Sequence, residues 1–361
     1  MACHPVARAA SPAAQPAPES EKPSASQQQP LPEGNRVQGS AACLECHQRE
    51  TLSLTFENGE TLSLYLQPEA YEKSVHGGKL ACTDCHANVA RYPHPKTRLT
   101  SRRDYVIAQY DTCKRCHFAN YTKTLDSVHY QVFSTGEKNA PVCTDCHTAH
   151  TVALPAEPRA KISDACGRCH TKVYEDYAGS VHGWALLDEG NPDVPVCTTC
   201  HGVHSIQSAS SASFHLASTE LCAKCHSDKK LMDKYGISSN VLQTYLDDFH
   251  GKTVSFARQQ SRTVWSDKAV CTDCHGVHEI KKTDDPTAPT MKANLSKTCQ
   301  KCHPEATENF SAAWLSHYDP SLKKASIVYL VKAYYWILIP AMVGGLALHI
   351  LLDLWRLARN R

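Results

Sequence analysis

Residues 143–150 read Cys-Thr-Asp-Cys-His-Thr-Ala-His, and residues 197–204 read Cys-Thr-Thr-Cys-His-Gly-Val-His. The shared pattern Cys-x-x-Cys-His occurs nine times in the 361 residues and uses 18 of the 19 cysteines. The nine motifs are Cys43-Cys46-His47, Cys82-Cys85-His86, Cys113-Cys116-His117, Cys143-Cys146-His147, Cys166-Cys169-His170, Cys197-Cys200-His201, Cys222-Cys225-His226, Cys271-Cys274-His275 and Cys299-Cys302-His303. With only 7 phenylalanines in the chain, large apolar side chains are too few for an ordinary core, so something other than side chains is expected to fill the interior.

Three kinds of site use paired cysteines. A zinc ribbon needs two pairs per metal and no histidine after each, and nine pairs would leave one over. A disulfide framework also leaves the histidines unexplained. Haem attachment explains all three residues, because the two thiols add to the haem vinyl groups and the adjacent imidazole binds the iron as its proximal ligand. The motifs therefore predict nine c-type haems, each with the histidine of its own motif as proximal ligand.

Two types of motif alternate along the chain. First-type motifs, at Cys43, Cys113, Cys166, Cys222 and Cys299, lead into a stretch that ends at a further histidine; second-type motifs, at Cys82, Cys143, Cys197 and Cys271, have a second histidine shortly after their own. We interpret the array as a lone first haem followed by four two-haem units, a repeat that usually builds a linear stack.

This repeat supplies nine further histidines at corresponding places, which we predict to be the distal iron ligands: His76, His94, His129, His150, His182, His204, His250, His278 and His317. His94 and His317 fit the repeat least well, and His215 is the first alternative. The sequence does not fix which distal histidine serves which iron. Methionine is scarce, with 4 copies, and two imidazoles favour lower potentials than a His/Met pair. Donors such as menaquinol, or extracellular acceptors, are therefore expected.

The predicted fold is mainly helical and irregular, with short helices packed around a linear haem array of residues 43–320. Helices are expected at 172–178 and 231–247. Alternating apolar residues at 52–66 surround Asn58-Gly59, which predicts a β-hairpin that covers the first haem.

The two ends differ from the array. Residues 1–42 are rich in Pro, Ala, Ser and Gln, which predicts a disordered tether. Cys3 is interpreted either as a lipidated anchor or as a stray thiol. Residues 325–356 predict one transmembrane helix, with 357–361 as a cytoplasmic tail and the haem array on the periplasmic side of a bacterial membrane. His349, inside this span, is either a haem b ligand shared with a partner subunit or a polar residue near the headgroups.

The array of Cys-Thr-Asp-Cys-His and Ser-Val-His elements over residues 43–320 resembles the membrane-associated multihaem cytochromes c of respiratory chains. The tail Gly-Gly-Leu-Ala-Leu-His349 is similar to the first helix of haem-b subunits that accompany such cytochromes and formate dehydrogenases. The resemblance implies quinol oxidation through a haem-b or quinone-binding membrane partner and electron export to other cytochromes or acceptors. Quinol-dehydrogenase cytochromes of nitrate and nitrite respiration carry their helix at the N-terminus instead.

Three functions follow from these features. We expect an electron-transfer subunit rather than an enzyme, in a respiratory or photosynthetic complex. The alternatives are a multihaem oxidoreductase with one open catalytic haem, acting on nitrite or hydroxylamine, and a conduit that polymerises into filaments. Balanced charge, with 38 Lys+Arg against 36 Asp+Glu, gives no indication of nucleic-acid binding.

Overall fold

The computed structural model describes residues 40–96, 98–154, 158–259, 268–312, 317 and 319–360. Most of the expected N-terminal tether, including Cys3, lies outside these ranges. Residues 40–42, which we expected in the tether, already form the first turn of helix α1.

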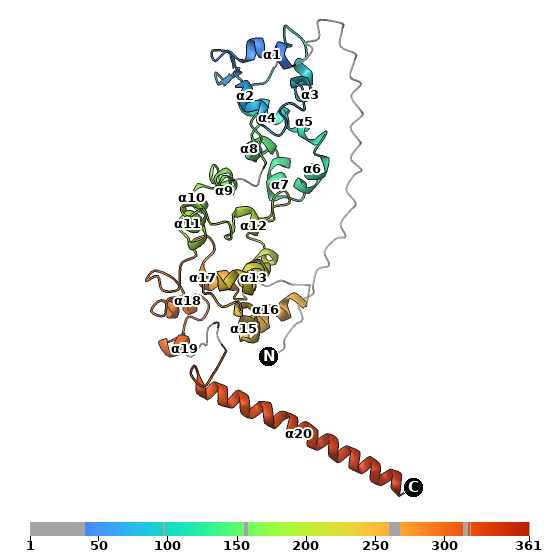
Figure 1. The fold of residues 1–361 in the computed structure, drawn as a ribbon, viewed down its shortest axis with the longest axis vertical. Helices are drawn as coiled ribbons and strands as arrows, with labels where there is room; N and C mark the ends of the chain where they lie inside the picture. Colours follow the sequence, from blue (N-terminus) through green and yellow to red (C-terminus); the bar gives the residue numbers. More distant parts are fainter. Residues whose placement is uncertain are drawn as a thin grey trace, which may run out of the picture.

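Short helices follow one another along an elongated body, from α1 at one end to the long α20 at the other (Figure 1). Their bounds are α1 Ser40–His47, α2 Pro68–Glu72, α3 Cys82–Cys85, η1 Ala87–Val89, α4 Arg102–Ala108, α5 Tyr110–Lys114, α6 Phe118–Thr124, α7 Val128–Ser134, α8 Cys143–His147, α9 Ala160–Gly167, α10 Thr171–Ala178, α11 Val181–Leu187, α12 Cys197–His201, α13 Ala212–His226, α14 Lys229–Asp233, α15 Val241–Asp247, α16 Phe249–Gln259, α17 Cys271–His275, α18 Leu295–Gln300, α19 Glu308–Ala312 and α20 Ser326–Arg359. With strands β1 Ser53–Thr55 and β2 Thr61–Ser63, these elements confirm the predicted fold class.

The predicted hairpin is present and packs on the first motif. Strands β1 and β2 pair antiparallel, with Leu54 opposite Leu62. Gly59 in the turn has a φ of 85°, a conformation that suits glycine. Just beyond β2, the carbonyl of Leu64 lies 2.9 Å from Nδ1 of His47. The hairpin therefore helps to hold the proximal histidine of the first motif.

Helix α10 matches the helix predicted at 172–178, but the prediction of one helix over 231–247 is wrong. The chain forms α14 and α15 there, separated by a turn. Gly236 adopts a φ of 66°, which ends α14, and the amide of Ile237 donates back to the carbonyl of Met232 over 3.1 Å. Such a left-handed residue after a helix is a common stop signal, and apolar periodicity alone does not reveal it.

Buried apolar side chains form two small clusters within the described residues. One contains Leu216, Tyr245, Val254 and Val270, and the other contains Tyr177, Leu186 and Val196. Such clusters are small for a body of this length, which agrees with the expectation that side chains alone do not fill the interior.

Helix α20 is long and apolar enough to cross a membrane. Its most apolar window has a mean hydropathy of 2.0, and none of that window is buried against the rest of the chain. A helix of 34 residues spans about 51 Å at 1.5 Å per residue. The helix runs to Arg359, so residues 357–359 of the expected tail are helical. This fits a C-terminal membrane anchor.

Candidate haem sites

The eighteen predicted ligand histidines come together in nine pairs, each containing one proximal and one distal histidine. The distances between ring centroids range from 5.8 to 6.3 Å. The pairs are His47–His94, His86–His150, His117–His76, His147–His204, His170–His129, His201–His278, His226–His182, His275–His317 and His303–His250. Sequence reasoning named both members of every pair but none of the pairings.

This spacing fits an iron between two imidazoles. A metal–imidazole bond is about 2 Å long, and two such bonds plus the half-widths of two rings place the centroids about 6 Å apart. No site with three or more His, Cys, Asp or Glu side chains around one point occurs in the described part of the chain. The side chains therefore suit a group that brings its own equatorial ligands, as haem does.

The first pair also has suitable ring orientations. Nδ1 of His47 contacts the carbonyl of Leu64, and Nδ1 of His94 lies 2.6 Å from the carbonyl of Arg91. Both Nε2 atoms are thus left for the iron, and backbone carbonyls fix both rings in the way that second-shell partners of metal ligands usually do. His94, which fitted the repeat least well, therefore has a defined partner.

Burial keeps several ligand candidates neutral. Burial, and to a lesser degree the neighbouring ring of each pair, lowers the pKa of His182 and of His275 to about 4. A neutral imidazole is the form that binds metal.

The pairings cross the boundaries of the repeat units according to one rule. The proximal histidine of every first-type motif except the first pairs with the histidine that ends the stretch after the preceding first-type motif, as His117 does with His76. The proximal histidine of every second-type motif except the last pairs with the distal histidine that follows the next second-type motif, as His86 does with His150.

The two ends of the array explain both irregular histidines. His94 pairs with the first motif because no earlier unit supplies a histidine to His47. His317 pairs with His275 of the last second-type motif, so it pairs in the same way as His150 although it follows the first-type motif at Cys299.

Contacts between cysteines show how successive motifs neighbour one another. The first cysteines of four couples of motifs are within hydrogen-bonding contact: Cys43 with Cys82, Cys113 with Cys143, Cys166 with Cys197, and Cys222 with Cys271. The remaining motif is the one at Cys299, so the lone motif is the last one; the interpretation that placed it first is wrong. No disulfide joins the eighteen motif cysteines.

The segments that carry the distal histidines are built around a tyrosine. The hydroxyls of Tyr71, Tyr177 and Tyr245 donate to a carbonyl two residues before the first cysteine of the following motif, at 2.9, 2.6 and 2.8 Å. Three residues after Tyr177, Ser180 accepts a hydrogen bond from the amide of Gly183 and caps α11. The tyrosine thus fixes the distance between a distal histidine and the next motif.

The amide next to the distal histidine also links one unit to the next. The amides of Val75, Val128 and Val181 donate to the carbonyls of Val152, Ile206 and Ile280, at 2.9, 2.8 and 2.9 Å. Each acceptor lies two residues after His150, His204 or His278. One backbone hydrogen bond therefore places two predicted distal histidines, which belong to different histidine pairs, beside each other.

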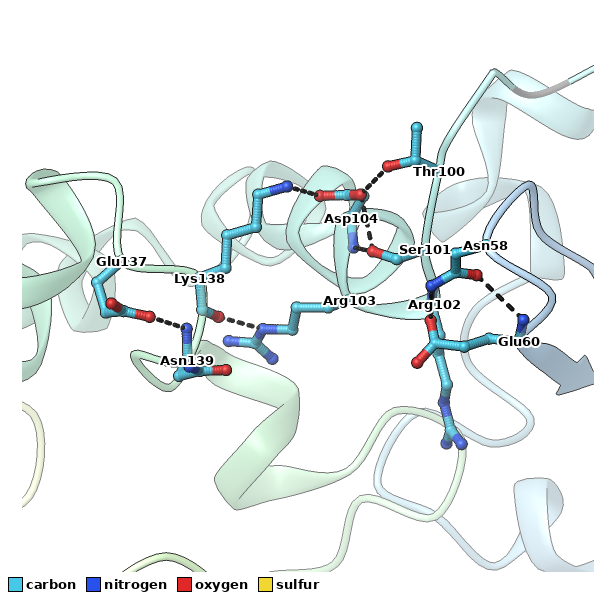
Figure 2. Close-up of polar contacts among 10 residues, drawn as sticks. All are labelled: Asn58, Glu60, Thr100, Ser101, Arg102, Arg103, Asp104, Glu137, Lys138 and Asn139. Atoms are coloured by element: carbon cyan, nitrogen blue, oxygen red, sulfur yellow. Dashed lines mark hydrogen bonds and ion pairs between the residues drawn. The ribbon is translucent and has the colours of Figure 1, made fainter.

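The second unit lacks this tyrosine, since Thr124 stands where the others have it. Arg103 takes over its role: its Nε donates to the carbonyl of Lys138 over 2.6 Å and its Nη2 to the carbonyl of Ala140 over 2.5 Å. The next residue, Asp104, pairs with the Lys138 ammonium at 2.7 Å (Figure 2). These contacts hold the loop that enters the motif at Cys143.

Large apolar side chains beside the histidine pairs are exposed on the protein. Phe118, Phe249 and Phe310 are 63%, 75% and 50% exposed, and the Phe310 ring lies 5.3 Å from the His303 ring. Phe118 directly follows His117, and Phe249 directly precedes His250. Apolar groups gathered around metal-ligand candidates form a suitable cradle for a porphyrin.

Two histidines and one cysteine singled out from the sequence are not part of the nine histidine pairs. His215 belongs to no pair; its Nε2 contacts the Asp273 carboxylate at 3.0 Å, and its Nδ1 is buried without a partner. His349 is exposed on α20, where Nδ1 lies 3.4 Å from Asp353. Cys3 lies outside the described residues.

Comparison with known protein families gives one match. Residues 133–174 match the family described as doubled CXXCH motif, a stretch that contains the motifs at Cys143 and Cys166. No curated protein and no solved structure matches the chain. The matched motif and its repetition define a multihaem c-type cytochrome, in which haem c is attached through Cys-x-x-Cys-His motifs.

Proposed function

We propose that the chain is an electron carrier with nine c-type haems, each bound by one proximal and one distal histidine. The observation that carries this proposal is the complete pairing of the eighteen histidines at one common spacing. Haem iron supplies one-electron chemistry, and a second imidazole closes the position at which a substrate would bind. A fully paired array is therefore suited to carrying electrons rather than to catalysis.

The contacts between successive motifs support transfer along the whole array. Beyond the four couples joined through their first cysteines, the second cysteine of each second-type motif lies near a cysteine of the next motif. Cys85 neighbours Cys113, and Cys274 neighbours Cys299. Each motif thus has a neighbour on both sides, except at the ends.

We further propose a membrane complex in which α20 anchors the array and a haem-b or quinone-binding subunit supplies electrons from a quinol. Gly344 and Gly345 support this, since two adjacent glycines on an exposed apolar helix let a partner helix approach closely. His349 is the candidate for a shared haem b ligand. Other cytochromes or extracellular acceptors would take electrons from the array.

Haem counting and spin state test the proposal. Mass spectrometry of the intact, purified chain should give nine attached haems, and EPR of the oxidised protein should show low-spin iron only. The alternative, a multihaem oxidoreductase with an open catalytic haem, predicts a high-spin signal and binding of carbon monoxide after reduction. Either result would refute the pure-carrier function. Co-purification of non-covalent haem with the detergent-extracted complex, and its loss in His349→Ala, tests the partner.

A further inference from the structure

The residue two positions after the first cysteine has the same structural role in all four second-type motifs. The side chain of Asp84, Asp145, Thr199 or Asp273 accepts a hydrogen bond from the backbone amide three residues earlier, over 2.7, 2.7, 3.1 and 2.7 Å. Each therefore caps the short helix that carries the two attachment cysteines. We call this residue the cap residue.

The charge of the cap residue differs among the four motifs although its capping role does not. Thr199 is neutral. Asp145 forms an ion pair with Arg103, whose single Nη1 lies 3.1 and 2.9 Å from the two carboxylate oxygens. Asp273 accepts from Nε2 of His215, which lies 3.2 and 3.0 Å from its oxygens.

The Asp84 carboxylate, among the described residues, has no arginine or histidine partner of this kind. Among the described residues, its side chain makes the cap bond to Ala81 and no ion pair is formed with it. Arg115 donates instead to the Asp84 backbone carbonyl over 2.8 Å. The four motifs thus present an uncompensated carboxylate, a carboxylate paired with a guanidinium, a neutral hydroxyl, and a carboxylate paired with an imidazole.

The Arg103–Asp145 and His215–Asp273 contacts are partly buried. The side chains of Arg103 and Asp145 are 26% and 34% exposed, and those of His215 and Asp273 are 23% and 38% exposed. Charges in such places are screened less than charges in open solvent. Because a cap residue stands between two cysteines attached to the same haem, its charge acts on that haem at short range.

We propose that the cap residue and its partner set the local charge at each second-type haem and so grade the reduction potentials along the array. The inference rests on the proposed electron-carrier function. A carboxylate stabilises the ferric form, which carries one more positive charge than the ferrous form, and lowers the potential. Arg103 and His215 act as positioning residues, because Arg103 supplies a positive charge and His215 a hydrogen-bond donor to the carboxylate with which each is in contact.

The sharpest test changes charge and keeps the cap. Thr199→Asp adds a carboxylate that can still accept from the Val196 amide, and Thr199→Ser is the matched neutral control. A unit charge at about 10 Å in a medium of effective dielectric about 20 changes a one-electron equilibrium by roughly tenfold, or about 59 mV. Dithionite titration followed by absorbance adds one electron to each ferric centre and makes or breaks no bond.

We expect about one ninth of the absorbance change to move to lower potential in Thr199→Asp and none in Thr199→Ser. Asp84→Asn, which keeps an acceptor for the Ala81 amide, should move a similar fraction to higher potential. Arg103→Gln should lower one potential and Asp145→Asn should raise it. Variants that contain nine haems but follow the wild-type titration would overturn the inference, whereas fewer than nine attached haems in the wild-type chain would instead refute the proposed function.

Discussion

The pairing across units makes a specific prediction about His150. It lies three residues after His147 in the motif at Cys143, yet its ring is paired with His86 at 5.8 Å, while His147 is paired with His204 at 6.0 Å. Replacing His150 with glycine should therefore remove the distal ligand from the haem attached at Cys82 and Cys85, not from the haem of its own motif.

The magnitude follows from the number of pairs. His150 serves one of nine pairs, so His150→Gly should convert about one ninth of the low-spin iron to a five-coordinate, high-spin state. EPR of the oxidised protein measures this fraction directly. Carbon monoxide should bind to about the same fraction after reduction, since only that iron has an open position.

A second substitution locates the affected iron. In a Cys82→Ala, Cys85→Ala background the haem next to His86 is not attached, so His150→Gly should add no high-spin signal. In a Cys143→Ala, Cys146→Ala background the signal of His150→Gly should persist. The opposite pattern, in which the signal disappears with the Cys143 haem, would refute the pairing, and a high-spin fraction of about two ninths would refute the rule of one distal histidine per iron.

Three further perturbations test the supports of the array. A Cβ at Gly183 would lie 1.9 Å from the carbonyl oxygen of Tyr177, so Gly183→Ala should lower the free energy of unfolding by about 1–3 kcal/mol in thermal or denaturant unfolding, while Gly179→Ala, whose nearest contact is 3.6 Å, should be close to neutral. The pKa of Asp104 is lowered, first by the Lys138 ammonium and then by two hydroxyl groups, and a carboxyl with a lowered pKa stabilises the fold above the ordinary carboxyl pKa and loses this contribution as the pH falls. The difference in unfolding free energy between wild type and Asp104→Asn should therefore shrink as the solution is acidified below the ordinary carboxyl pKa. A difference that grows on acidification would contradict this assignment. Deletion of Ser326–Arg359 should move the haem-containing chain from the membrane fraction to the soluble fraction in detergent-free fractionation, whereas continued sedimentation with membranes would show that another segment anchors it.

The sequence predicted the kinds of residues at the sites better than their arrangement. Every histidine of the nine pairs could be named, because the motif fixes the proximal residue and the repeat marks the distal one. The pairings could not be read, since a distal histidine close to one motif in sequence pairs with the proximal histidine of another unit. His150 is the clearest case: proximity along the chain favours His147, and the fold places it on His86.

The break between α14 and α15 was missed for a related reason. The apolar spacing over 231–247 suits one helix, but it does not reveal that Gly236 adopts a left-handed conformation. The hairpin around Gly59 was predicted because a short Asn-Gly turn carries its own conformational signal. Local chemistry was therefore readable where a few neighbouring residues determine it, and not where contacts between distant segments decide.

Cross-unit ligation has a consequence for how the array can assemble. In the proposed nine-haem chain, each iron between two units would join a proximal histidine of one unit to a distal histidine of another, as in His117–His76 and His147–His204. The apolar clusters of the described residues are small, so much of the stability that holds neighbouring units together should come from these iron–histidine bonds. A unit that lacks its haems would lose links on both sides, and the loss of one haem should destabilise the neighbouring unit as well as its own. Partial haem loading should therefore give chains that are cut by protease at unit boundaries near the missing haem, whereas independent units would be cut without regard to which neighbour lacks it.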